Sequence, residues 1–338
     1  MGFKVENKGL LTLIQGGKRV GYQQYGVPVS GAMDEFSHRL GNILVGNKED
    51  EASLEILMIG PVLVFDKDTK IAVTGANLNP KINNTDIRMY KSYIVNKGDV
   101  LSFGSCESGC RAYVAFEGGI DVKPVMGSKS TYTKASMGGY EGRGLKENDY
   151  VKLFDLKDKS ISTIDDKYIK CFDSEVVLRV IKGPQDDMFL EGEFDKFLSS
   201  EYVVSNECDR MGYRLEGECI KHNNGADIVS DGIAFGAVQI PGHGKPIVMM
   251  SDRQTVGGYT KLCNVISVDL CKLSQLKPGD KIRFEEVDIY KAHEILREFE
   301  DYIVKIKESI KVQEVLRNRS IVLSIDGVIF NTFVEEVK

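Results

Sequence analysis

The sequence contains no run approaching the ~18 consecutive apolar residues that a membrane-spanning helix requires. Its first residues, Met1 to Glu6, include no apolar segment of the kind that defines a secretory signal. We therefore expect neither a membrane span nor a secretory leader.

Clustered positive charge is also missing. The formal net charge is -6 and no basic cluster occurs, which argues against nucleic acid as the main partner. The four histidines are scattered and include no His-x-x-x-His pair. The sequence therefore gives no support for a catalytic metal site.

The cysteines do not form a dense framework. There are seven, an odd number, and they are spread along the chain. Cys106-x-x-x-Cys110 has a spacing that zinc could use, but no second Cys or His pair follows nearby. Reduced thiols of a cytoplasmic protein are the better interpretation.

Short extended segments dominate what is present. From Ala52 to Phe103, runs rich in β-branched residues are separated by Gly, Pro, Asn or Asp, as is typical of strands in a barrel. A turn of similar chemistry starts a strand ending in Phe in both halves of the chain: Lys97-Gly98-Asp99 before 100–103, and Lys277-Pro278-Gly279-Asp280 before 281–284. A duplicated barrel unit explains this repetition.

A length of 338 residues is enough for about two domains. We predict a first β-barrel half over 1–155, a linker over 156–174, a second half over 175–287 and an extension over 288–338. The extension should contain a helix over 290–318, from its helical apolar spacing, and a hairpin that turns at Asp326-Gly327.

The clearest candidate site follows the apolar strand 246–250. Five polar residues, Ser251 to Thr255, come directly after it, and Gly257-Gly258 allows the backbone to approach a ligand closely. An ordinary polar loop with a solvated ion pair would have the same composition.

Three further groups have two interpretations each. Asp209, Arg210 and Arg214 form either a buried ion-pair brace or planar forks for a carboxylate or phosphate. Ser30 and Asp34 either cap a helix that begins at Met33 or Asp34, with Ser30 as N-cap, or face an anionic or amide substrate. The Gly- and Ser-rich segment 125–143 is either a binding loop or a mobile surface loop.

An ordered series of motifs resembles the KipA family, also called allophanate hydrolase subunit 2, biotin-dependent carboxyltransferase-like, or the PxpC subunit of 5-oxoprolinase. The resemblance covers roughly residues 8 to 287, at normal spacing. One departure is Gly16-Gly17-Lys18-Arg19, where relatives usually carry Asp-Leu-Gly-Arg. The motifs are Leu13-Ile14-Gln15, 27–34, Leu54-Glu55 with Gly60-Pro61, Thr74-Gly75-Ala76, 118–122, 127–132, 138–143, Gly183-Pro184-Gln185, 209–214, 251–255 and 277–280.

The resemblance implies a mainly β fold of duplicated cyclophilin-like β-barrel units and a KipI/PxpB-type partner. It implies a subunit of an ATP-dependent 5-oxoprolinase, acting also with a possible PxpA-type subunit. The alternatives are the carboxyltransferase subunit of a biotin-dependent urea or amide carboxylase, and a KipA-like regulator that antagonises a KipI-type inhibitor of a histidine kinase.

No covalently bound cofactor is expected. The chain has no Met-Lys-Met biotinylation tripeptide, so carboxybiotin would come from another chain. It also has no G-x-x-x-x-G-K-[ST] loop, so the ATP used by the complex is expected to bind elsewhere.

These arguments assign the following site residues. The catalytic candidates are Asp252, Arg253, Gln254, Asp209 and Arg210. The substrate-binding candidates are Ser30, Asp34, Arg143, Arg214, Gln239, Thr255, Gly257, Gly258, Tyr259 and Lys261. Arg or Gln donors would polarise the carbonyl of a small amide, and an Asp would accept its N–H.

Overall fold

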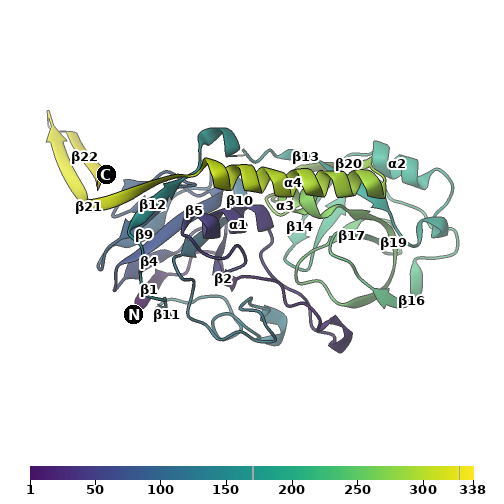
Figure 1. Cartoon of the computed structure of the whole chain (residues 1–338). Helices are drawn as coiled ribbons and strands as arrows, with labels where there is room; N and C mark the ends of the chain where they lie inside the picture. The colour runs from purple at the N-terminus through teal and green to yellow at the C-terminus, as the bar shows by residue number, and fades with distance from the viewer. Residues whose placement is uncertain (170, 327) are drawn as a thin grey trace. The chain divides into compact units, whose positions relative to one another are not determined.

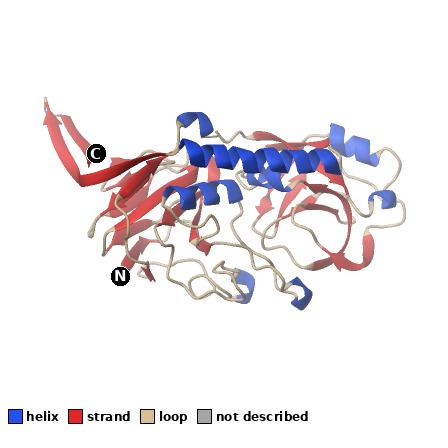
Figure 2. Ribbon diagram, viewed as in Figure 1, coloured by secondary structure: helices blue, strands red, loops and turns tan. Residues whose placement is uncertain are grey.

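The computed structural model describes residues 1–169, 171–326 and 328–338, and it is mainly β, as predicted (Figures 1 and 2). The chain forms two compact units. Unit 1 comprises Met1–Gly17, Glu35–Cys171 and Val304–Lys338, and unit 2 comprises Lys18–Asp34 and Phe172–Ile303. Among the described residues, no helix has both the length and the apolar character needed to cross a bilayer.

Among its described residues, unit 1 contains two larger antiparallel sheets, with strand orders β11-β1-β4-β9-β6-β7 and β2-β3-β10-β5-β8, and a three-stranded sheet of order β12-β21-β22. Its first strands are β1 (Gly2–Asn7), β2 (Leu11–Gln15), β3 (Ser53–Leu57), β4 (Val62–Phe65), β5 (Thr69–Asn77), β6 (Pro80–Ile82) and β7 (Thr85–Asp86). They are followed by β8 (Ser92–Val95), β9 (Val100–Phe103), β10 (Ser108–Phe116), β11 (Tyr150–Lys152) and β12 (Ser160–Thr163). Its helical segments before residue 304 are α1 (Glu35–Leu44), η2 (Thr133–Ala135) and η3 (Asp166–Tyr168).

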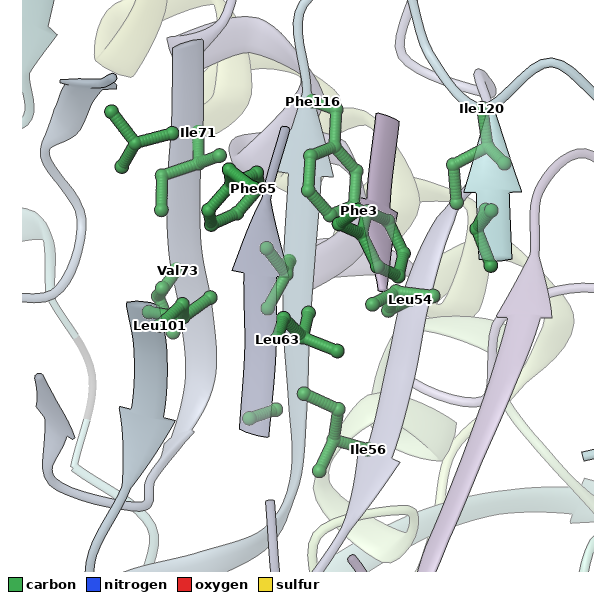
Figure 3. Packing of buried hydrophobic residues seen from close by; sticks show 14 of the residues in the cluster. Phe3, Leu54, Ile56, Leu63, Phe65, Ile71, Val73, Leu101, Phe116 and Ile120 are labelled. Carbon is green, nitrogen blue, oxygen red and sulfur yellow. The ribbon is translucent and has the colours of Figure 1, made fainter. Parts of the chain in front are cut away.

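Side chains of both sheets contribute to the core of unit 1 (Figure 3). In β4, Leu63 and Phe65 are buried while the residues before each of them are partly exposed, which is the period of two expected of a strand. Phe3 stacks on Phe116 at 5.3 Å and meets Phe65 edge-on at 6.1 Å. Burying each such ring contributes roughly 1.5–3 kcal/mol.

Helix α1 packs on β5 and β10 and carries a buried histidine, His38. The His38 ring meets Tyr113 edge-on at 5.8 Å, and the Tyr113 hydroxyl donates to Glu55 Oε2 at 2.8 Å. Burial lowers the pKa of His38, although Glu55 and Glu35 oppose the shift. The folded protein therefore holds this imidazole neutral more firmly than the unfolded chain does.

The stability of the protein should accordingly fall as the pH drops below about 6.5, the ordinary pKa of histidine, because the unfolded chain then takes up a proton that folded His38 resists. Urea unfolding at pH 7.5 and 5.5 measures this loss. His38→Gln should show a smaller loss, whereas the same change at exposed His293 should leave it unaltered. Equal pH dependence in all three proteins would contradict the assignment.

Unit 2 contains a closed barrel. Within the described residues, seven strands pair in the cyclic order β13-β20-β14-β15-β18-β17-β19, and β19 pairs back onto β13. The strands are β13 (Glu175–Lys182), β14 (Tyr202–Cys208), β15 (Gly212–Glu216), β17 (Ala237–Ile240), β18 (Ile247–Met249), β19 (Val256–Val265) and β20 (Lys281–Glu286), with β16 (Asp227–Gly232) added beside β19. The helical segments before residue 289 are η1 (Gln23–Tyr25), η4 (Asp186–Met188), α2 (Glu193–Ser199) and α3 (Ser267–Leu273).

The turn before β9 shows why its residues recur in the sequence. Gly98 has φ +95°, a conformation that favours glycine. Asp99 Oδ2 accepts a hydrogen bond from the backbone N–H of Asn96 at 2.7 Å. The turn is fixed to β4 because the Gly98 N–H donates to Phe65 O and the Phe65 N–H donates to Asp99 O.

The turn before β20 repeats this geometry. Gly279 has φ +94°, and Asp280 Oδ2 accepts from the Lys277 N–H at 2.9 Å. The Gly279 N–H donates to Val204 O of β14, and the Val204 N–H donates to Asp280 O. The two units thus share a turn, the strand that follows it and the contact of the turn with a neighbouring strand, which is consistent with a duplicated β-unit.

The C-terminal extension consists of α4 (Ile289–Ser309) and the hairpin of β21 (Lys311–Ile325) and β22 (Val328–Val337), drawn in yellow-green and yellow in Figure 1. The predicted helix over 290–318 is wrong at its end, because 311–325 is rich in β-branched residues and pairs with β12 and β22. The predicted turn includes Gly327, which lies outside the described residues, and Ile325 pairs with Val328 across it. The segment predicted as a linker contains β12 and η3.

Candidate functional site

Unit 2 has a cavity of about 490 Å³ on one face of its barrel sheet. Five of the predicted site residues line it: Asp209, Arg214, Gln239, Gln254 and Tyr259. The other lining residues are Asn206, Glu207, Cys208, Met211, Gly212, Ile247 and Met249. A volume of this size suits a small-molecule ligand.

The strand register places these side chains together. Arg214 of β15 and Gln239 of β17 both pair with Ile247 of β18, and Gln239 also pairs with Lys261 of β19. Directly paired residues lie on the same face of a sheet. The side chains of Arg214, Ile247, Gln239 and Lys261 therefore form a row across β15, β18, β17 and β19. Alternate residues such as Val248 point into the barrel core.

Gln239 is the most buried polar residue of the cavity wall, with an exposed fraction of 2%. Its Nε2 has no hydrogen-bond partner in the described part of the chain. Gly257 makes room for this amide, because a Cβ there would lie 3.2 Å from Gln239 Nε2 and 2.7 Å from Ile233 Cδ1. A buried amide with an unused donor is a suitable binding group for a ligand oxygen.

The polar run after β18 is fixed by a buried ion pair. Asp252 accepts two hydrogen bonds from Arg210, at 2.8 Å from Nε and 3.2 Å from Nη2, and both side chains are nearly fully buried. Arg210 Nη2 also donates to Gly31 O at 2.7 Å. For Arg210 the structure therefore shows the brace geometry, with Asp252 as its partner.

Arg253 is buried as well. Its Nε donates to Ile233 O at 3.0 Å, its Nη1 donates to Met250 O at 3.3 Å, and its guanidinium lies 5.4 Å from the centre of the Phe235 ring. Burial lowers the pKa of Arg253 to about 10. Arg253 does not line the cavity, whereas its neighbour Gln254 does.

Ser30 and Asp34 lie on a segment attached to the same loop. The Ser30 N–H donates to Ser251 O at 3.1 Å, and Asp34 Oδ2 accepts from Gln275 Nε2 at 2.7 Å. The prediction of Ser30 as a helix N-cap is wrong, because α1 begins only at Glu35 and Ser30 has φ +51°. Ser30 Oγ is buried and has no partner among the described residues.

Lys261 and Asp209 are engaged locally. Lys261 Nζ donates to Asp231 Oδ2 at 2.5 Å and to Gly232 O at 3.0 Å, so its charge is already paired. Asp209 Oδ1 accepts from the backbone N–H groups of Met211 and Gly212, which fixes the turn before β15.

Thr255 and Gly258 have backbone roles. The Thr255 carbonyl accepts from the Ile233 N–H, and Gly258 lies in β19, where a Cβ would come within 3.3 Å of Ile228 O. Neither residue lines the cavity.

Arg143 belongs to unit 1. Its guanidinium donates to both carboxylate oxygens of Asp149 and to Glu141 Oε2. The hydrogen bonds to Asp149 and Glu141 raise the pKa of Arg143. Burial would raise the pKa of Asp149, but the hydrogen bonds that it accepts lower it. The structure shows an ion-pair network for Arg143.

Several residues of this region were not anticipated from the sequence. Phe235 and Gln275 gave no signal, because their roles depend on contacts with residues distant in sequence. Ile247 and Met249 belong to the apolar strand 246–250, and their alternation with Val248 indicates that they lie on the other face of the sheet. Among the described residues, no group of three His, Cys, Asp or Glu side chains is placed to hold a metal ion, and no disulfide joins any of the seven cysteines.

The class of protein follows from comparison with known families. Residues 25–286 match the family described as carboxyltransferase domain, subdomain A and B. The chain therefore belongs to this family, and the resemblance to the KipA/PxpC group is confirmed.

Particular relatives narrow this assignment. The chain is 34% identical over 289 residues to the C-subunit of 5-oxoprolinase from Escherichia coli, covering 86% of this chain and 92% of that protein. It is 33% identical over 337 residues to the urea amidolyase of Lachancea kluyveri, covering 92% of this chain but 18% of that protein. Among solved structures, K. lactis urea amidolyase superposes with a TM-score of 0.84 at 30% identity, over 90% of this chain and 20% of that one.

The Kluyveromyces lactis urea carboxylase structure superposes with a TM-score of 0.83 at 28% identity. That match covers 99% of this chain and 32% of the carboxylase. The chain thus spans about a fifth to a third of these large enzymes, and nearly all of the 5-oxoprolinase C-subunit.

Proposed function

We propose that this chain is the PxpC subunit of an ATP-dependent 5-oxoprolinase, which converts 5-oxoproline, ATP and water to glutamate, ADP and phosphate. The observation that carries the proposal is that this chain has nearly the length of a 5-oxoprolinase C-subunit. The alignment covers 92% of the Escherichia coli protein but 18% of a urea amidolyase. The proposed partners are a KipI/PxpB-type subunit and a PxpA-type subunit, within the cytoplasm.

The cavity of unit 2 supports a small amide as ligand. The Gln239 amide nitrogen, which is buried in the cavity wall, would turn toward the ligand and donate to the lactam carbonyl, and the Asp209 carboxylate would accept the lactam N–H. Hydrogen bonds to the carbonyl stabilise the negative charge that develops on its oxygen during ring opening. The Arg210–Asp252 pair would hold the loop that presents Gln254 to the same cavity.

ATP is proposed to bind on a partner chain, because this sequence has no phosphate-binding P-loop. A residue of the cavity is proposed to transfer the proton to the leaving nitrogen. The candidate is Asp209, because it lines the cavity. As a carboxylate it would take a proton from the attacking water and pass that proton to the ring nitrogen as the C–N bond breaks.

A second candidate function is the carboxyltransferase subunit of a biotin-dependent amide or urea carboxylase. The superposition on urea carboxylase covers 99% of this chain and so extends over α4 and the hairpin. Carboxybiotin would be delivered by another chain, since no Met-Lys-Met tripeptide is present.

Reconstitution tests the proposal directly. The chain is purified with its KipI/PxpB-type and PxpA-type partners, and ATP-dependent glutamate release from 5-oxoproline is followed. We expect turnover that disappears when this chain is left out. Turnover that persists without the chain would refute the proposal, and tight partner binding without turnover would favour the carboxyltransferase or the KipA-like regulatory function.

A further inference from the structure

We propose that Arg214 binds a carboxylate of the ligand, so that the cavity of unit 2 selects a carboxylate-bearing lactam over a simple amide such as urea. This inference rests on the proposed function and assigns its substrate selectivity to one side chain. It comes from the charge, the exposure and the strand register of the cavity wall.

Arg214 is the cationic residue among those that line the cavity. The nearby cation Lys261 is already paired with Asp231, and Arg210 is paired with Asp252. Arg214 Nε has an ion pair with Glu207 Oε2 at 3.0 Å, but the Arg214 side chain is 50% exposed and that of Glu207 is 76% exposed. An exposed pair of this kind is weak, so a bound carboxylate can replace Glu207, whose side chain then turns into solvent.

The register separates the two ligand-binding groups by a suitable distance. Arg214 and Gln239 pair with Ile247 from opposite sides, so their Cα atoms lie two strand spacings apart, or about 9.5 Å. Both side chains are long, and a small ring lying over Ile247 can be reached by the guanidinium at one end and the amide at the other. A planar guanidinium matches a carboxylate with two parallel hydrogen bonds.

Asp209 is the third proposed ligand-binding group, beside Arg214 and Gln239. It directly precedes the turn into β15, whose first residue, Gly212, pairs with Met249, two residues from Ile247 on β18. In 5-oxoproline the ring N–H lies between the carboxylate-bearing carbon and the carbonyl carbon. Because Asp209 Oδ1 already accepts two backbone N–H groups, its negative charge is partly compensated and repels the ligand carboxylate less.

The test compares Arg214→Gln with Arg283→Gln in the reconstituted complex. Arg283 is a matched control, because it is also exposed, also has one carboxylate at 3.0 Å, and does not line the cavity. We expect Arg214→Gln to raise KM for 5-oxoproline about 10- to 100-fold with little change in kcat, since uniform substrate binding is lost. Arg283→Gln should leave both constants unchanged.

A ligand without the carboxylate gives the decisive comparison. 2-Pyrrolidinone, used as a competitive inhibitor, should bind wild type and Arg214→Gln equally. An unchanged KM for 5-oxoproline, or equal weakening of both ligands, would overturn the role of Arg214 while leaving the oxoprolinase proposal intact. If wild type shows no turnover, calorimetric titration of the purified chain with 5-oxoproline and urea tests the inference separately: Arg214-dependent binding of 5-oxoproline alone supports it, and binding of neither or of both overturns it.

Discussion

Replacing Asp252 by alanine should lower the free energy of unfolding by about 3–5 kcal/mol, because it removes the carboxylate that accepts two hydrogen bonds from the buried Arg210 guanidinium. Arg210 would keep its hydrogen bond to Gly31 O but lose both bonds to Asp252. Urea unfolding followed by circular dichroism measures this loss. We also expect activity to fall, since the destabilised loop carries Gln254, which lines the cavity.

A double variant distinguishes the effect of leaving Arg210 without its ion-pair partner from the effect of lost packing. Arg210→Met with Asp252→Leu removes both charges, so it should be markedly more stable than Asp252→Ala alone. The matched control is the exposed pair of Glu201 with Arg283, where Glu201→Ala should hardly change stability. If Asp252→Ala were no more destabilising than Glu201→Ala, the buried pair would not be a brace.

The sequence predicted the location of this loop, but it did not predict that Asp252 would pair with Arg210. Five polar residues directly after an apolar strand indicated either a site or an ordinary loop with a solvated ion pair. In the structure Asp252 of this loop instead forms a buried ion pair with Arg210. The spacing alone could not show that Arg210 would choose Asp252, 42 residues away, rather than the adjacent Asp209. That choice depends on the strand order β15-β18, which places the two loops side by side.

Local sequence patterns also gave wrong predictions where contacts with residues distant in sequence determine the structure. The helical spacing that defines α4 continues weakly beyond Ser309, yet 311–325 forms a strand because β12 and β22 provide partners for its backbone. Ser30 has the composition of an N-cap, but its left-handed backbone and its bond to Ser251 O place it before the helix start. By contrast, the repeated Gly-Asp turns were predictable, since their geometry is fixed by residues adjacent in sequence.

Gln239→Met should reduce kcat/KM for 5-oxoproline about 100-fold without destabilising the protein. Methionine has a similar length and no polar hydrogen, so the cavity wall keeps its shape while the donor to the lactam carbonyl is lost. The amide nitrogen of Gln239 has no partner among the described residues, so its removal relieves a desolvation cost of about 1–3 kcal/mol. The free energy of unfolding should therefore stay constant or increase.

The control is Gln15→Met in unit 1, where the glutamine is also buried and its Oε1 also has no partner among the described residues, but its Nε2 donates to Thr131 O at 3.1 Å. This variant loses a real hydrogen bond, so it should be destabilised by about 1–3 kcal/mol. Opposite signs of the two stability changes, with activity lost more strongly at Gln239, would identify a group kept for ligand binding at the expense of stability. Destabilisation by Gln239→Met as large as that by Gln15→Met, with activity unchanged, would instead show that Gln239 is an ordinary structural residue of the barrel wall.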